Sequence, residues 1–172
     1  MKIAYVIGPG RGDTDLVLAS VAESIGAAGV KICGTVQVNT ECDGDGPCDM
    51  DVQVLPDGPV IRISQSLGPE ARGCRLDPGA LETAIASCEK RLDGAEVLLV
   101  NKFGKQEALG RGFRSLIGDA LAREMPVVVG LNALNKEAFF AFTEGAAEQV
   151  SPDRDAILSW VLAALERAPN AA

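Results

Sequence analysis

The chain has 172 residues, a formal net charge of −8 and a sequence pI near 4.6. This length suits one well-packed domain spanning residues 1–172, and an acidic chain with one Trp, one Tyr and five Phe is not expected to bind nucleic acid. Histidine is absent, which excludes Ser-His-Asp and Cys-His catalysis and histidine-based zinc sites.

The N-terminal residues and the cysteines predict a cytoplasmic protein. Residues 2–7 form an apolar run of strand length that is followed by Gly8-Pro9-Gly10. This run is too short for a signal peptide or a membrane span, so membrane insertion is not expected. Five cysteines are an odd number, and we expect free thiols in place of a disulfide framework. The oligomeric state stays open, with a homo-oligomer among the alternatives.

The chain opens with a strand, a glycine-rich loop and a helix. This order points backbone N–H groups and a positive helix end at a phosphate. A phosphate-binding P-loop needs G-x-x-x-x-G-K-[ST], but Gly8 and Gly12 are one residue too close together and Asp13 replaces the lysine. Thr14 is either a hydroxyl ligand or a helix cap. The loop is either an anion site or a glycine-rich turn that has lost triphosphate binding.

A second strand is predicted at residues 30–38, and the loop that follows is acidic and holds Cys42 and Cys48. An EF-hand is excluded, because the glycine and the terminal glutamate of that calcium loop are missing. Cys42 and Cys48, joined by Cys74 from a later loop, could bind a soft metal, but C-x5-C is a weak zinc signal. The pattern favours a solvated acidic loop.

Two short strands, residues 52–55 and 60–63, flank a Pro-Asp-Gly-Pro turn and predict a β-hairpin. Because a hairpin breaks the alternation of strands and helices, we expect an antiparallel insertion at about residues 50–65 on the edge of the sheet. A long loop rich in Gly and Pro follows, and it carries Arg72 and Arg75. The two guanidinium groups either bind an oxyanion or are ordinary surface side chains.

The rest of the chain alternates helices and strands. The pattern predicts a helix that is capped by Asp77 and ends near residue 91, a strand at 95–100, a helix at 113–123, a strand at 126–130, a helix at 135–142 and a last helix that begins at Ser151-Pro152-Asp153. Cys88 and the phenylalanines near residue 140 are expected in the core. This alternation predicts an α/β fold with a largely parallel sheet.

Four cations follow the strand at residues 95–100, namely Lys102, Lys105, Arg111 and Arg114. The chain as a whole is acidic, so this segment reverses the local sign of the charge. Ligands of parallel sheets bind outside the carboxyl ends of the strands, and the segment therefore predicts an anion site. The alternative is a solvated loop and the polar face of the next helix.

Three segments together resemble the small cancer-related nucleoside-triphosphatase family: residues 8–14, the strand that ends in Asn101-Lys102-Phe103-Gly104-Lys105-Gln106-Glu107, and Asp153-Arg154-Asp155. In that family the central strand ends in an Asp-Glu-Ile-Gly-Lys-Met-Glu-type Walker B segment. Nearly the whole chain is still more similar to a bacterial family of nucleoside-triphosphatase-like proteins with Asn-Lys-Phe-Gly-Lys-Gln-Glu and Arg-Gly-Cys-Arg-Leu-Asp segments, usually encoded beside molybdate-transport genes. The resemblance implies a P-loop-NTPase-like three-layer fold.

The departures from the nucleoside-triphosphatase pattern predict that hydrolysis has been lost. Asp13 stands in place of the phosphate-binding lysine, whereas Asn101 and Lys102 stand in place of the Mg²⁺ ligand and the catalytic carboxylate. Without these carboxylates nothing obvious holds Mg²⁺ or orients an attacking water, so Mg²⁺ is not expected as a cofactor. Lys102 could instead neutralise an oxyanion, and could pair with Asp13 when the site is empty.

We therefore expect a non-hydrolytic protein that binds a small oxyanion or a nucleotide at a degenerate P-loop site, with molybdate or tungstate suggested by the family resemblance alone. The alternative is a nucleoside triphosphatase with an atypical site. No catalytic and no metal-binding residue is predicted. The predicted anion- or nucleotide-binding residues are Gly8, Gly10, Arg11, Gly12, Asp13, Thr14, Arg72, Arg75, Asn101, Lys102, Lys105 and Arg111.

Overall fold

The computed structural model describes residues 1–10, 12–39, 49–65 and 75–167. Two of the predicted ligand-binding residues, Arg11 and Arg72, lie outside the described residues, and so do Cys42, Cys48 and Cys74. None of the described helices is long and apolar enough to cross a membrane.

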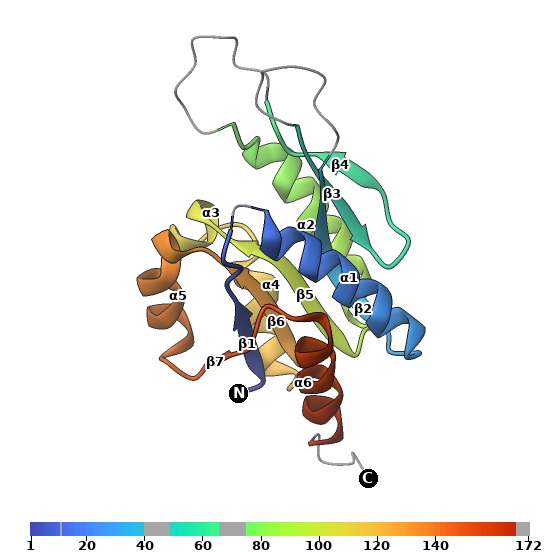
Figure 1. Ribbon diagram of the computed structural model, residues 1–172. Helices are drawn as coiled ribbons and strands as arrows, with labels where there is room; N and C mark the ends of the chain where they lie inside the picture. Colours follow the sequence, from blue (N-terminus) through green and yellow to red (C-terminus); the bar gives the residue numbers. More distant parts are fainter. Residues whose placement is uncertain (11, 40–48, 66–74, 168–172) are drawn as a thin grey trace.

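A seven-stranded sheet with the order β4-β3-β2-β5-β6-β1-β7 forms the middle layer (Figure 1). Its strands are β1 (Ile3–Val6), β2 (Ile32–Asn39), β3 (Met50–Leu55), β4 (Val60–Arg62), β5 (Val97–Phe103), β6 (Val127–Leu131) and β7 (Glu148–Gln149). Strands β2, β5, β6, β1 and β7 are parallel, whereas β3 pairs antiparallel with β2 and with β4. The predicted α/β fold, the largely parallel sheet and the inserted hairpin are thus confirmed.

Helices cover both faces of the sheet (Figure 1). They are α1 (Asp13–Ala27), α2 (Pro78–Leu92), α3 (Lys105–Ala108), α4 (Arg114–Ala122), the 3₁₀-helix η1 (Ala133–Asn135), α5 (Lys136–Thr143) and α6 (Arg154–Glu166). Helices α1 and α6 pack on one face, and α2, α4 and α5 pack on the other. Successive residues of β1 alternate between the two apolar clusters, as the two-residue period of a strand requires.

Two helix starts confirm the capping predictions. The Asp77 carboxylate accepts hydrogen bonds from the backbone N–H groups of Gly79 and Ala80 at the start of α2. The Asp153 carboxylate does the same for the first turn of α6. Each cap satisfies two N–H groups that lack a partner within the helix, so these sequence signals fixed where both helices begin.

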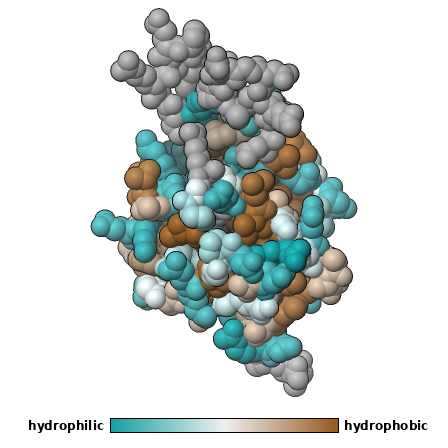
Figure 2. All heavy atoms as spheres, viewed as in Figure 1, coloured by the Kyte–Doolittle hydropathy of each residue, from teal (hydrophilic) through white to brown (hydrophobic). Residues whose placement is uncertain are grey.

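Aromatic side chains pack at the carboxyl end of the sheet, as predicted for the core. Phe139 is fully buried and lies edge-on to Tyr5 and Phe103, with ring centroids 5.6 and 5.2 Å apart. These contacts attach α5 to β1 and β5, because edge-to-face rings attract each other at this distance. On the face shown in Figure 2, hydrophobic and hydrophilic residues are interspersed in small groups.

Candidate functional site

The candidate site lies at the carboxyl edge of the sheet, where the parallel strands β1, β6, β5 and β2 end side by side. Strand β1 leads through Gly8 and Gly10 into α1, and β5 ends in the segment that carries the predicted cations. Neighbouring strands of a sheet lie about 4.8 Å apart, and sheets of this kind bind ligands at this edge. The topology therefore brings the first loop and the end of β5 to the same edge.

The first loop is closed by side chains of the helix that follows it. The backbone N–H of Gly8 donates to Oγ1 of Thr14 at 2.8 Å, and the N–H of Gly10 donates to Oδ2 of Asp13 at 2.8 Å. A Cβ atom at Gly8 would lie 2.8 Å from Thr14, and a Cβ atom at Gly10 would lie 2.7 Å from Asp13, so neither position has room for a side chain. Two backbone donors of the kind that bind phosphate in P-loops are thus occupied by the chain itself.

Helix α1 begins differently from the predicted capping arrangement. Its N-cap is Gly12, which has a φ of 88° and makes no side-chain capping bond. Asp13 and Thr14 lie inside the first turn and turn their side chains back onto the loop. Asp13 nevertheless favours the helix, because a carboxylate in the first turn interacts well with the positive end of the helix dipole.

Asn101 connects three elements behind the loop. Its side chain is 5% exposed; the amide nitrogen donates to Oδ1 of Asp15 and the amide oxygen accepts from the backbone N–H of Gln37, both at 2.9 Å. These bonds join the end of β5 to the first turn of α1 and to β2. Neither Asp15 nor Gln37 is among the predicted ligand-binding residues. The one sequence signal for this network was a polar residue that directly follows an aliphatic strand.

A β-bulge at the end of β5 orients the neighbouring side chains. Val100 pairs with Val129 and Phe103 with Leu131, so β5 has one residue more than β6 between these pairs. Gly130 lies in the gap, where a side chain would come within 2.0 Å of a backbone oxygen of β5. An extra residue changes which face the following side chains occupy, and Phe103 therefore enters the cluster beneath α5.

The position of Lys102 corrects one expectation. The strand was predicted to end at Val100, with Lys102 just beyond it, but β5 continues to Phe103 and Lys102 is the exposed residue of the bulge. Lys102 and Asp13 form no ion pair in the described part of the chain, and the Asp13 carboxylate accepts a hydrogen bond from the Gly10 N–H.

The other cations of this segment lie on α3, on the turn that follows and at the start of α4. Lys105 and Arg111 are exposed, whereas Arg114 is half-buried. The Arg114 guanidinium lies 4.6 Å from the centre of the Phe142 ring, a cation–π contact. Within the residues that the structure describes, none of the salt bridges involves Lys102, Lys105 or Arg111. These three charges are therefore available to an anion, and Arg114 is engaged in packing.

Glu107 holds this cationic segment in shape. It is 3% exposed, and its carboxylate accepts from the backbone N–H groups of Gly104 at 2.9 Å and Phe113 at 3.0 Å. Burial raises the pKa of the Glu107 carboxyl, although the two backbone donors act in the opposite direction. Gly112 has a φ of 61° and lies against the carboxylate, where a side chain would come within 2.1 Å. The sequence prediction missed both α3 and this positioning role.

Arg75 lies beside the hairpin. Its Nη2 is 3.3 Å from Oδ1 of Asp49, and Asp49 also pairs with Arg62 at 3.0 Å. Met50, the first residue of β3, pairs with the last residue of β2, so the base of the hairpin also lies at the carboxyl edge. Arg75 is therefore on the predicted edge of the sheet but engages a carboxylate there.

The described cysteines are buried in the core, as expected for free thiols. The Cys33 thiol donates to the backbone oxygen of Cys88, and the Cys88 thiol donates to the backbone oxygen of Gly34, both at 3.3 Å. A hydrogen bond with Cys33 and burial raise the pKa of the Cys88 thiol. Among the described residues, no group of three or more Cys, Asp or Glu side chains is arranged to hold a metal ion.

The fold built on this sheet is similar to that of a nucleoside triphosphatase of known structure. The solution structure of a human cancer-related nucleoside triphosphatase matches it with a TM-score of 0.62 at 18% sequence identity, over 99% of this chain and 100% of that chain. The chain belongs to the family described as "Protein of unknown function (DUF2478)", whose model matches residues 3–160.

The chain is also similar to part of a curated transport protein. The chain is 33% identical over 162 residues to the "Molybdenum import ATP-binding protein ModC 2" of Bradyrhizobium diazoefficiens. The match covers 92% of this chain and 18% of that protein, so the chain corresponds to a minor part of the relative's length.

Proposed function

We propose that the protein binds a small oxyanion or a nucleotide at a degenerate P-loop site and does not hydrolyse it. The observation that carries this proposal is the hydrogen bond from the Gly10 N–H to the Asp13 carboxylate. A P-loop has a lysine at this point, which attracts the phosphates. Here a carboxylate occupies a loop donor and repels polyphosphate, so a ligand has to displace it or bind beside it.

The end of β5 supports the absence of hydrolysis. Phosphoryl transfer by P-loop enzymes depends on Mg²⁺ and on a residue that orients the attacking water. The Asn101 side chain is uncharged, and both its nitrogen and its oxygen are engaged, by Asp15 and by Gln37. The next residue, Lys102, is a cation that would oppose a metal ion.

The exposed cations supply the anion-binding part of the proposal. Lys102, Lys105 and Arg111 are exposed on β5, on α3 and on the turn that follows. A charge-assisted hydrogen bond to an oxyanion is stronger than a neutral one. We propose that these side chains contact the ligand together with the loop residues Gly8, Gly10, Arg11, Gly12 and Thr14. We propose Arg72 and Arg75 as further ligand contacts, of which Arg75 lies beside the hairpin.

A link to molybdate or tungstate is the finer part of the proposal. It is supported by the printed name of the relative, a molybdenum import ATP-binding protein, of which the chain matches 18%. Molybdate and tungstate are tetrahedral oxyanions that would accept hydrogen bonds from the same donors as phosphate. We further propose that residues 1–172 act as a single domain in the cytoplasm.

An atypical nucleoside triphosphatase is the second candidate, and the structural match favours it. The matched human protein is a nucleoside triphosphatase, and this chain keeps a threonine hydroxyl at Thr14 where a P-loop places its Mg²⁺ ligand. In this structure, however, that hydroxyl accepts a hydrogen bond from Gly8.

Equilibrium binding of radiolabelled ATP, GTP and molybdate to the purified protein tests the proposal. We expect saturable binding of at least one of these anions, weakened by added salt because exposed cations are screened. Binding that is equally strong at high salt, or no binding of any anion, would contradict the proposed site.

A further inference from the structure

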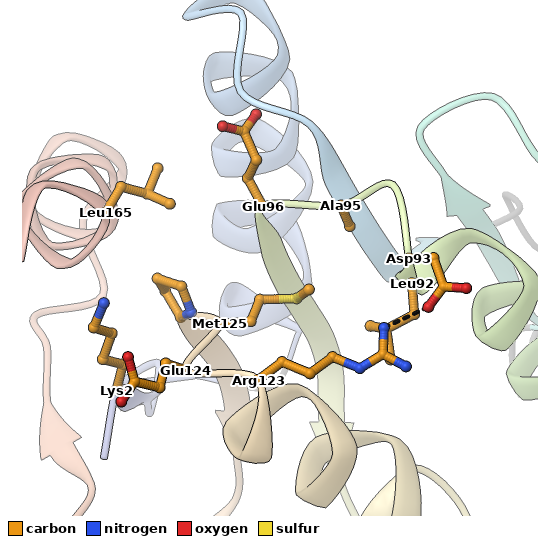
Figure 3. A pocket seen from close by; sticks show the side chains of 10 residues that line it. Lys2, Leu92, Asp93, Ala95, Glu96, Arg123, Glu124, Met125 and Leu165 are labelled. Atoms are coloured by element: carbon orange, nitrogen blue, oxygen red, sulfur yellow. Dashed lines mark hydrogen bonds and ion pairs between the residues drawn. The ribbon is translucent and has the colours of Figure 1, made fainter. Parts of the chain in front are cut away.

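A hollow at the opposite edge of the sheet is separate from the candidate site. Its volume is about 320 Å³, and residues at the amino ends of β1, β5 and β6 line it together with residues of α2 and α6 (Figure 3). This volume is within the range of about 300–1,000 Å³ that is usual for small-molecule sites. Its position makes it independent of the anion site proposed above.

Lys2 is one of the residues that line the hollow, and its terminal nitrogen is a buried polar atom. Lys2 immediately precedes β1, and its backbone oxygen accepts from the N–H of Val127 at 2.8 Å, which fixes the start of its side chain. The Nζ atom of Lys2 is buried, and in the described part of the chain it has no hydrogen-bond partner. A buried charge without a partner is unfavourable, and a turn of the flexible Lys2 side chain toward an anion in the hollow would remove that penalty.

Three of the neighbouring charged groups, Arg123, Asp93 and Glu96, are already engaged. Arg123 donates from Nη1 to the Asp93 carboxylate, which Figure 3 shows as a dashed line. The Glu96 carboxylate accepts from the backbone N–H of Lys31 at 2.9 Å. Lys2 is therefore the lining cation that lacks a partner among the described residues.

The same carboxylates restrict the charge of a ligand. Asp93, Glu96 and Glu124 all line the hollow. Because their carboxylates are negative, they repel an anion with several charges more strongly than a monoanion. The remaining walls are largely apolar and include Leu92, Met125, Pro126 and Leu165. A ligand therefore needs one negative group for Lys2 and an apolar body for these walls.

We propose that this hollow binds a small monocarboxylate with an apolar body, whose carboxylate pairs with Nζ of Lys2. Two sources share this chemistry. One is a simple aliphatic carboxylate, and the other is an apolar α-amino acid, whose ammonium group would meet the carboxylates of Glu96 and Glu124. The shared feature is the single carboxylate on an apolar group.

Titration of the ¹⁵N-labelled protein, followed by backbone amide shifts, tests the site directly. The probes are hexanoate, leucine, hexylamine and inorganic phosphate. We expect hexanoate or leucine to shift amides near Lys2, Glu96 and Met125, and the tighter of the two identifies the source. No shift with either carboxylate overturns the proposal. So does hexylamine binding as tightly as hexanoate, because the site would then not recognise the carboxylate.

Lys2→Met keeps the length of the side chain and removes its charge, and Lys31→Met is the matched control at the same edge. Lys31 is exposed, and its bond to Glu96 uses the backbone. We expect Lys2→Met to lose about ten- to a hundredfold in affinity for the carboxylate, and Lys31→Met to bind like the wild type. Equal binding by Lys2→Met overturns the proposal. The shift map of the wild type decides alone if that variant does not fold.

Discussion

Replacing Asp13 by alanine should make the first loop a better anion site. In the wild type the Asp13 carboxylate accepts the Gly10 N–H at 2.8 Å, so an incoming anion has to compete with it. Hydrogen bonds to charged groups contribute about 1.5–3 kcal/mol, and two like charges about 4 Å apart repel by about 1 kcal/mol in water. Because Asp13 is partly exposed, we take the lower part of this range and expect anion affinity to rise about tenfold.

The same substitution should cost stability to a small and known extent. Asp13 is in the first turn of α1, and a first-turn carboxylate stabilises a helix by about 0.3–1 kcal/mol. Asp155→Ala is the matched control, because Asp155 is an exposed carboxylate in the first turn of α6. Its ion pair with Arg154 lowers the pKa of the Asp155 carboxyl, so this control also loses a charge that is present at neutral pH.

Calorimetric titration with phosphate, molybdate and ADP measures the effect. We expect Asp13→Ala to bind at least one of these anions more tightly than the wild type, and Asp155→Ala to bind like the wild type. The reasoning is refuted if Asp13→Ala binds every anion with the affinity of the wild type or more weakly. In that case the carboxylate does not compete with ligand, and the loop is only a turn.

Further predictions concern the end of β5 and α3. Lys102→Ala should weaken anion binding about ten- to a hundredfold, and the fold should stay intact because Lys102 is exposed. Calorimetric titration measures the affinity, with Arg123→Ala as the control. Unchanged binding by Lys102→Ala would exclude Lys102 from the site. Asn101→Leu should lower the free energy of unfolding by about 1–3 kcal/mol, because it leaves Asp15 and a backbone N–H without their partner; urea unfolding checks this value. Burial raises the pKa of Glu107, so its contribution to stability is complete below the ordinary glutamate pKa and falls as pH rises through the raised pKa. Urea unfolding between about pH 4 and about pH 7 should therefore show that the free energy of unfolding of Glu107→Gln rises relative to that of the wild type as pH rises. A difference between the two free energies that does not change with pH would argue against a raised pKa.

The sequence predicted the layers of the fold well, because its local signals are strong. Hydrophobic runs marked the parallel strands, a Pro-Asp-Gly-Pro turn marked the hairpin, and Asp77 and Asp153 marked two helix starts. Each of these patterns determines the structure of residues close to it in the sequence, so they could be interpreted without knowledge of distant contacts. The short elements α3 and β7 carry too few residues to show a period, and both were missed.

The sequence pointed to the carboxyl edge of the sheet, where the candidate site lies, but it did not indicate the contacts that its residues make there. The hydrogen bond from Asn101 to Asp15 spans 86 positions in the chain, and no local pattern indicates which polar groups such a bond joins. The bulge that leaves Lys102 exposed depends on the close approach of Gly130 in β6, and a single glycine in a strand is only a weak signal for it. The role in ligand binding stays a prediction for every residue of the predicted site.

Phosphate release under conditions of proven occupancy tests the central claim most directly. The wild-type protein is first saturated with ATP or GTP, as judged by the binding assay. If the wild type binds too weakly, the Asp13→Ala variant is used in its place. Free phosphate is then measured with Mg²⁺ present. We expect no release above the uncatalysed background, because Asn101 and Lys102 stand where P-loop enzymes hold Mg²⁺ and orient water. Turnover faster than about 0.01 per second, a rate at or above those of slow intrinsic GTPases, would contradict this expectation and establish the atypical nucleoside triphosphatase.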